Sequence, residues 1–245
     1  MSRLMDVLAR MTPFSSTEEA LQLVCGRRGN RPMVIGFVNQ HALNLAIGDR
    51  DFYRHLLRCD LLLRDGRGAE MACQVLGREP GANLNGTDLI PALLEQHRGQ
   101  RIALFGTAEP WLEGAVKALR KQGLDVVAAL DGFQKETVYE DAVVAARPDI
   151  IVLAMGMPRQ EAVAAHLAGA INSPVLIING GAILDFIAGR TPRAPLWMRR
   201  MGLEWLYRLS REPRRLFSRY VLGIPVFAAR VLRERFTGTR VKAAA

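Results

Sequence analysis

The chain alternates short apolar runs with longer segments in which apolar residues recur at about every third or fourth position. The short runs are rich in Val, Ile and Leu and are soon followed by Gly, Asn or Asp, which is typical of buried strands. This alternation predicts an α/β fold with a Rossmann-like, mostly parallel sheet flanked by helices. The strands are expected at residues 33–38, 59–63, 101–105, 125–130, 150–155 and 175–178, and helices at 69–76, 89–97, 109–122, 136–146 and 160–168.

Glycine and polar residues follow the end of every predicted strand. Parallel strands bring their carboxyl ends to one edge of a sheet, and open α/β sheets bind ligands there. Glycine lets a ligand approach the backbone, and the next helix offers free N–H groups to phosphate. One such turn is ordinary loop chemistry, but six at one edge favour a nucleotide or sugar-phosphate site. They are Asn39, Asp65-Gly66, Gly106-Thr107, Asp131-Gly132, Gly156-Met157-Pro158 and Asn179-Gly180-Gly181.

Several common site motifs are missing from the sequence. No glycine turn has the spacing G-x-G-x-x-G or G-x-x-x-x-G-K-[ST], so dinucleotide redox chemistry and ATP hydrolysis lose support. No serine lies in G-x-S-x-G, which disfavours a serine hydrolase. None of the four histidines has the spacing H-x-x-x-H or H-E-x-x-H that is typical of metal sites. They are His41, His55, His97 and His166. A metal-independent reaction without a cofactor is therefore expected.

Asp65 is the candidate for acid–base chemistry, because it follows an apolar strand and precedes a glycine turn. A carboxylate in a partly dry cleft is suited to act as a general base, since desolvation raises its pKa. The alternative is that Asp65 caps the next helix, because Asp is favoured at that position. Thr87 or Asp88 can likewise cap the helix that runs through Leu94.

Charge divides the chain into a body and a basic C-terminal appendage. Residues 190–242 carry fourteen of the thirty-three Lys and Arg residues against three acidic ones, a local net charge of +11 within a chain of +9. Such a segment suits an anionic partner. We therefore expect a core at residues 1–189 and an appendage at 190–245.

The appendage also has an apolar pattern, which leaves three interpretations open. An amphipathic helix can lie in the bilayer interface, with Trp and Leu buried and Arg at anionic headgroups. It can instead pack on the body or between copies of the chain. Nucleic acid is disfavoured, because the apolar residues recur at near-helical spacing. They are Leu196, Trp197, Met201, Leu203, Trp205, Leu206 and Leu209.

The ends and the cysteines of the chain bear on its location. The N-terminus lacks the apolar stretch of a secretory signal, and no later run reaches the roughly 18–20 apolar residues that span a bilayer. The three widely spaced cysteines, Cys25, Cys59 and Cys73, are expected to be free thiols in a reducing compartment. The sequence predicts a cytoplasmic protein with peripheral membrane contact.

Several longer motifs occur together in one order: VNQHALNLA, RDGRGAEMACQVLG, NLNGTDLIPALL, IALFGTAEP, PDIIVLAMGMPRQE and the run from INGGAILDFIAGR to RLFSRY. In this they resemble the WecG/TagA/CpsF family of bacterial glycosyltransferases, glycosyltransferase family 26. The resemblance covers roughly residues 15–230. Its most specific parts are the turn at residues 156–161 and the arginine-rich run at 193–215.

The resemblance implies inverting transfer of a sugar from a UDP-sugar to a saccharide on polyprenyl diphosphate, at the inner face of the cytoplasmic membrane. The products of the family feed common antigen, teichoic acid, capsule or exopolysaccharide. Asp65 matches the family's proposed base. Carried onto this chain, the substrate-binding residues are Asn39, Asn85, Gly86, Thr87, Asp88, Gly106, Gly156, Pro158, Arg159, Gln160, Glu161, Gly180, Gly181 and Asp185, with Gln160 the leading nucleotide-side contact.

The chemistry of such a transfer fits these roles. An attacking hydroxyl must lose one proton, so a single base suffices. The leaving UDP develops negative charge, and without a metal, helix N-termini and arginines must stabilise it. Guanidinium groups grip diphosphate oxygens bidentately. The candidates in the appendage are Arg193, Arg208, Arg214 and Arg215.

One position departs from the resemblance. Many relatives have arginine in a run R-V-T-G-T-D, where this chain has Asn83. Loss of that charge shifts the expected donor from an acidic or N-acetylated sugar towards a neutral hexose such as glucose. A second class of function also remains open, in which the chain binds a nucleotide-sugar or serves as a scaffold without turnover.

Overall fold

All six strands lie in one sheet, and every pair of neighbouring strands is parallel, in a computed structural model that describes residues 2–27 and 29–243. The strand order is β2-β1-β6-β5-β3-β4. This confirms the predicted fold class, and no predicted strand boundary is wrong by more than two residues. The strands are β1 (Met33–Val38), β2 (Leu61–Arg64), β3 (Arg101–Gly106), β4 (Asp125–Leu130), β5 (Ile150–Ala154) and β6 (Leu176–Asn179).

Helices cover both faces of the sheet, because successive strand residues point to opposite sides. Val34 and Val38 belong to one buried cluster, and Ile35 and Phe37 belong to the other. The first cluster takes in α1 (Arg3–Arg10), α3 (Gln40–Gly48), α4 (Arg50–Leu57), α5 (Arg67–Val75), α8 (Glu136–Ala146) and α9 (Arg159–Ala170). The second takes in α2 (Thr17–Gly26), α6 (Gly86–Gln96), α7 (Trp111–Lys121) and α10 (Ile183–Ile187).

The chain reverses its winding between β1 and β6. These strands are neighbours, but β1 leads into α3 on one face and β6 leads into α10 on the other. Helices that diverge from adjacent strands leave a crevice at the carboxyl edge of the sheet, which is where open α/β folds bind ligands. Asn39 and Asn179-Gly180 lie at this point.

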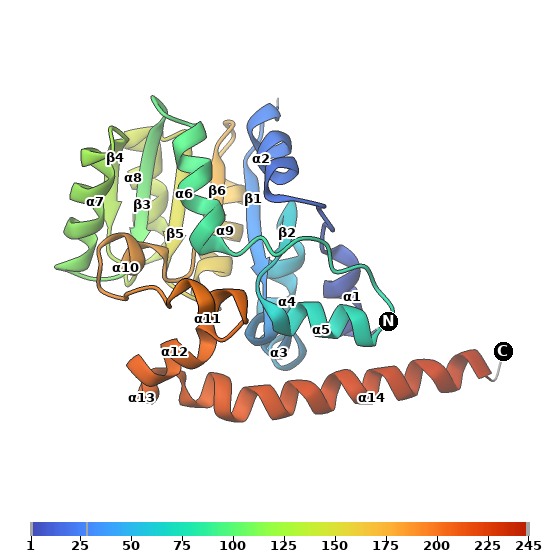
Figure 1. The fold of residues 1–245 in the computed structure, drawn as a ribbon. Helices are drawn as coiled ribbons and strands as arrows, with labels where there is room; N and C mark the ends of the chain where they lie inside the picture. Colours follow the sequence, from blue (N-terminus) through green and yellow to red (C-terminus); the bar gives the residue numbers. More distant parts are fainter. Residues whose placement is uncertain (1, 28, 244–245) are drawn as a thin grey trace.

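The C-terminal appendage forms α11 (Leu196–Arg200), α12 (Glu204–Arg211), α13 (Pro213–Phe217), the π-helical turn η1 (Ser218–Leu222) and α14 (Gly223–Ala243). Figure 1 shows these elements beneath the sheet, with α14 lying beside α5. Asn44 Nδ2 donates to the Gly223 carbonyl (2.8 Å), and Arg230 donates to Asn44 Oδ1 (2.9 Å). Phe227 and Val231 join the first buried cluster. Within the described residues, no helix has the length and apolar character needed to cross a membrane.

Candidate active site

Asn39 and Asp65 meet at the carboxyl ends of β1 and β2. Asn39 is the N-cap of α3, and its Oδ1 accepts hydrogen bonds from the His41 and Ala42 amides, both at 3.0 Å. That capping role leaves Nδ2 free to donate to Asp65 Oδ2, at 3.1 Å. The helix cap therefore orients an amide donor towards a partly exposed carboxylate.

The turn after β2 holds Asp65 in place. Gly66, with a φ of +83°, is the N-cap of α5, so the alternative that Asp65 caps this helix is wrong. The Gly66 amide donates to Asn83 Oδ1 (2.7 Å), and Asp65 N donates to the Val38 carbonyl (2.9 Å). A Cβ on Gly68 would lie 2.6 Å from Gln40 Cβ, which makes glycine necessary where α5 approaches α3.

A cavity of about 630 Å³ opens beside Asp65. Its lining changes in character from one end to the other. The polar residues near β1, β2 and α6 are Asn39, Gln40, Asp65, Asn83, Asn85 and Thr87. The cations are Arg67, Arg199, Arg208 and Arg219, and the appendage also contributes the acid Glu204. The apolar side chains come mainly from α5 and α14, and they are Met71, Ala72, Val75, Ile224, Phe227, Ala228, Val231 and Leu232.

Arg219 is a cation that sequence reasoning did not select. Its side chain is partly buried, and desolvation lowers its pKa, while the nearby Tyr220 and Asp65 oppose the shift. Its Nε has no hydrogen-bond partner. The Arg208 guanidinium lies 5.4 Å from the centre of the Phe186 ring. Arg208 and Arg219 thus line the cavity together with Arg199, and guanidinium groups in such positions suit an anionic ligand.

The other selected arginines lie elsewhere. Arg193 donates to Asp88 Oδ1 at 2.5 Å, and this contact holds the pKa of Asp88 below its usual range. Asp88 sits in the first turn of α6, whose N-cap is Asn85, so Arg193 ties the appendage to the body. Arg214 and Arg215 are exposed and do not line the cavity, and Arg215 pairs with Glu212 at 2.6 Å.

A second group of turns lies at the ends of β3, β4 and β6. Thr107 Oγ1 donates to Asp185 Oδ1 (2.5 Å), and Arg190 lies 3.3 Å from the same oxygen. A Cβ on Gly106 would lie 2.3 Å from the Ala154 carbonyl oxygen, so β3 and β5 can approach this closely only with glycine there. Phe133, after β4, is 76% exposed. At this edge of the sheet, glycine allows a close approach to the backbone, and an aromatic ring is exposed.

Gln160 and Glu161, at the start of α9, are both only 1% exposed. Gln160 Oε1 accepts from the Gly181 amide and its Nε2 donates to Glu161 Oε1, both at 2.9 Å. Burial raises the pKa of Glu161 to about 7. Gln160 therefore holds the turn after β6, and a direct contact with substrate stays a prediction.

The other residues of the predicted nucleotide-side turn, at positions 156–159, directly precede Gln160 and Glu161. Arg159 donates to the Gln134 carbonyl, which ties the start of α9 to the turn after β4. Gly156 has a φ of +77°, and Pro158 is the N-cap of α9. A Cβ on Gly180 would lie 2.5 Å from Ile183 Cγ2. The turns after β4, β5 and β6 are thus linked to one another at the carboxyl edge.

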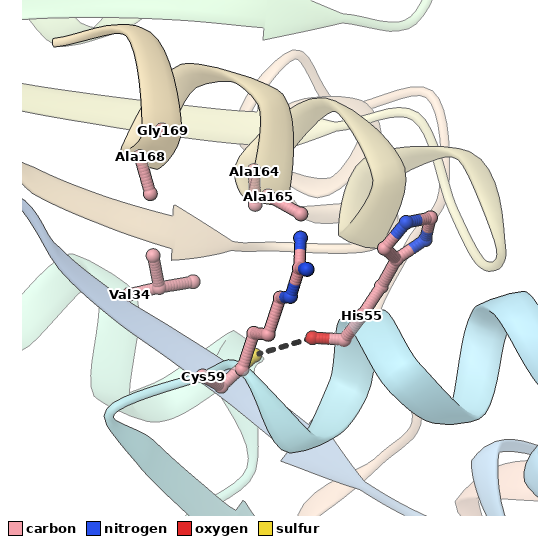
Figure 2. Close-up of a pocket in the computed structure, with 8 residues that line it drawn as sticks. Val34, His55, Cys59, Ala164, Ala165, Ala168 and Gly169 are labelled. Atoms are coloured by element: carbon pink, nitrogen blue, oxygen red, sulfur yellow. Dashed lines mark hydrogen bonds between the residues drawn. The ribbon is translucent and has the colours of Figure 1, made fainter.

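A second cavity, of about 210 Å³, lies between α4 and α9 (Figure 2). His55 and Cys59 lie on one side of it, and small residues of α9 such as Ala164 and Gly169 lie on the other. Cys59 Sγ donates to the His55 carbonyl at 3.9 Å. Val34, near the start of β1, also lines it, so this cavity faces away from the carboxyl edge of the sheet. In the described part of the chain, no group of three or more His, Cys, Asp or Glu side chains is arranged to hold a metal ion.

Comparison with known proteins gives a consistent result. The sequence profile of the glycosyl transferase WecG/TagA/CpsF family matches residues 6–241. An N-acetylglucosaminyldiphosphoundecaprenol N-acetyl-beta-D-mannosaminyltransferase of Bacillus subtilis (strain 168) is 31% identical over 206 residues, which cover 82% of this chain and 79% of the relative. A protein of the same name from Bacillus spizizenii (strain W23) is 28% identical over 184 residues, covering 73% and 70%.

Proposed function

Because the chain belongs to the WecG/TagA/CpsF family of glycosyl transferases, we propose that it transfers a sugar from a nucleotide-linked donor to a saccharide carried on polyprenyl diphosphate. The names of the two relatives support this acceptor class, since both act on N-acetylglucosaminyldiphosphoundecaprenol. The observation that carries the proposal is the Asp65 carboxylate, oriented by Asn39 beside a cavity lined with arginines.

Asp65 acts as the general base. The acceptor hydroxyl gives its proton to a carboxylate oxygen of Asp65 as its own oxygen bonds to the anomeric carbon. The bond from that carbon to the donor phosphate breaks, and the nucleoside diphosphate leaves with the electron pair. This single displacement inverts the anomeric carbon and needs no covalent enzyme intermediate. Asn39 positions the carboxylate through its 3.1 Å hydrogen bond.

The diphosphate is stabilised by arginines and helix N-termini, without a metal ion. Arg208 and Arg219 lie in the cavity, and Arg219 has an unpartnered Nε. Diphosphate oxygens suit such donors, since bidentate contacts match their geometry. The glycine turns after β3, β4, β5 and β6 then receive the UDP nucleoside, where Asp185 and Phe133 supply a carboxylate and an aromatic ring.

The donor is a UDP-sugar of the hexose or N-acetylmannosamine type. The names of the relatives favour N-acetylmannosamine. Asn83 favours a neutral hexose, because it occupies the position of a family arginine and uses its side chain to hold the Gly66 amide. A panel of UDP-sugars, with the product identified by mass and anomeric configuration, distinguishes the two.

The appendage docks on an anionic membrane surface at the cytoplasmic side. Of the sixteen large apolar side chains that are exposed in the described residues, eleven lie between Leu196 and Phe236. They accompany the +11 charge of this segment. An amphipathic surface with this composition suits anionic headgroups. Packing on the body leaves these side chains uncovered, so association between copies of the chain is the competing proposal.

The Asp65→Asn variant tests the catalytic proposal. It keeps the shape of the side chain but removes the base, so kcat should fall by roughly 10²–10⁴-fold while UDP binding stays within a factor of about two. Sugar transfer at the wild-type rate would refute the role of Asp65. Binding of UDP without transfer by the wild-type protein, over the full panel of donors and lipid-linked acceptors, would support a scaffold instead.

A further inference from the structure

The cavity extends beyond its polar end as an apolar groove between α5 and α14. The groove is lined by Met71, Ala72 and Val75 of α5 and by Phe227, Ala228 and Val231 of α14. On each helix the last of these residues lies four and three positions after the two adjacent ones, so each set forms one helix face. We call this region the α5–α14 groove.

Both helices start at the polar end of the cavity and run away from it. Arg67 is the first residue of α5, and Arg219 precedes α14 by one short turn. Gln40 Nε2 donates to the Arg219 carbonyl (3.4 Å) near this end, and Arg235 donates to the Val75 carbonyl (3.0 Å) at the other. Figure 1 shows the two helices side by side. The groove residues of α14 span positions 227–231, about 7.5 Å at 1.5 Å per residue.

The order of chemistry along the cavity is therefore carboxylate and amides, then cations, then an apolar channel. A sugar linked through diphosphate to an isoprenoid chain has the same order of saccharide, anion and hydrocarbon. We propose that the α5–α14 groove binds the first isoprene units of the polyprenyl carrier, so that the enzyme recognises part of the lipid as well as its headgroup. This inference rests on the proposed function, since it takes the acceptor to be lipid-linked.

Continuity favours this occupant over a bilayer acyl chain or a partner helix. The groove opens into the same cavity as Arg208, Arg219 and Asp65, so its occupant is attached to an anion near the base. Val226 and Phe236 of α14 are exposed and do not line the groove, whereas Phe227 and Val231 of the same helix are buried and do. One helix thus provides an inner face for a prenyl chain and an outer face for other contacts.

Farnesyl diphosphate is a soluble probe for this site, and inorganic pyrophosphate is its control. We expect the full-length protein to bind farnesyl diphosphate at least about tenfold more tightly than pyrophosphate in calorimetric titrations, because each buried methylene adds to affinity. Ala228→Trp fills the groove and should remove this advantage. Ala229→Trp adds the same ring at an exposed neighbouring position that does not line the groove, and should leave the advantage intact.

Equal affinity for the two probes, or an unchanged preference in Ala228→Trp, would overturn the groove proposal whether or not transfer is observed. Transfer assays then distinguish the groove proposal from the proposed transferase function. With acceptors that share one saccharide diphosphate and carry either a farnesyl or a methyl group, Ala228→Trp should lose kcat/KM for the farnesyl acceptor only. Loss with both acceptors would contradict the groove. No transfer by the wild-type protein to either acceptor would refute the proposed function while leaving the binding result to stand.

Discussion

Asn39 uses the two ends of one amide for two tasks, because its Oδ1 caps α3 while its Nδ2 donates to Asp65 Oδ2 at 3.1 Å. The cap determines which end faces the carboxylate. One side chain therefore both caps α3 and orients the proposed base. A suitable substitution can remove the second role and keep the first.

Asn39→Ser should preserve the fold but slow the reaction. Serine caps helices about as well as asparagine, whereas alanine costs about 1 kcal/mol. Serine has no amide donor for Asp65. We expect kcat to fall about tenfold to a hundredfold, since a hydrogen bond to a charged group contributes about 1.5–3 kcal/mol. Steady-state kinetics and thermal unfolding of Asn39→Ser and Asn39→Ala check this, and full activity in Asn39→Ser would contradict a positioning role.

Arg219→Gln should weaken UDP binding more than Arg214→Gln. Arg219 lines the cavity and is partly buried, whereas Arg214 is exposed and outside it. Loss of one charge-assisted contact predicts a rise in Kd of about tenfold to a hundredfold. Titration with UDP, accompanied by unfolding curves, checks the variants. Equal Kd values for both would place the diphosphate away from Arg219.

Glu161→Gln should change how stability depends on pH. Burial raises the pKa of Glu161 to about 7, above the ordinary 4.5 that applies to the unfolded chain. The folded protein therefore binds the proton more tightly, and stability declines as pH rises from 4.5 through about 7. The loss approaches about 3 kcal/mol, at 1.36 kcal/mol for each unit.

Glutamine keeps the acceptor for Gln160 and cannot ionise, so Glu161→Gln should become progressively more stable than the wild type over this pH window. Urea unfolding at pH 5, 6, 7 and 8 measures the difference. The exposed Glu18→Gln serves as the matched control and should follow the wild type. A constant difference between Glu161→Gln and wild type across the window would contradict the raised pKa.

Substitution of Trp197 and Met201 by Glu should weaken binding to anionic vesicles. Both side chains are 59% exposed in the basic appendage. The change removes apolar contacts and adds negative charge near headgroups of the same sign. Co-sedimentation with vesicles containing phosphatidylglycerol should fall at least about fivefold, and added salt should lower wild-type binding through screening. Val144→Glu, on the exposed face of α8, should bind as the wild type does, and equal binding by all three would refute docking through the appendage.

The strands and the glycine-rich turns at one edge of the sheet were predictable, because apolar runs and glycine turns are local signals. Helices α1 to α4 were missed. The sequence QHALNLAIG of α3 is apolar on several sides, since α1 and α14 cover it, and burial of that kind removes the amphipathic pattern. The predicted strand at residues 59–63 begins two residues early, because Asp60 instead accepts a hydrogen bond from the Val34 amide.

Residues of the candidate site were predictable only where their place directly after a strand determines their position in the fold. Asn39 and Asp65 follow neighbouring strands, so a sequence pattern could place both at one edge. Arg219 could not be chosen among fourteen basic residues of the appendage, since its burial depends on the path of α11 to α13 across the body. The same folding turns Arg193 towards Asp88 and leaves Arg214 in solvent.

Phe227 and Val231 are buried in one cluster with side chains of α3 and α5, which makes α14 part of the protein's interior as well as its outer surface. Any bilayer that binds the folded chain with α14 in place also shifts the unfolding equilibrium, because a ligand of the native state stabilises it by mass action. Binding to lipid and folding of the chain are then thermodynamically coupled. Under the proposed docking, molecules released from the membrane lose this stabilisation and unfold more readily than the bound ones.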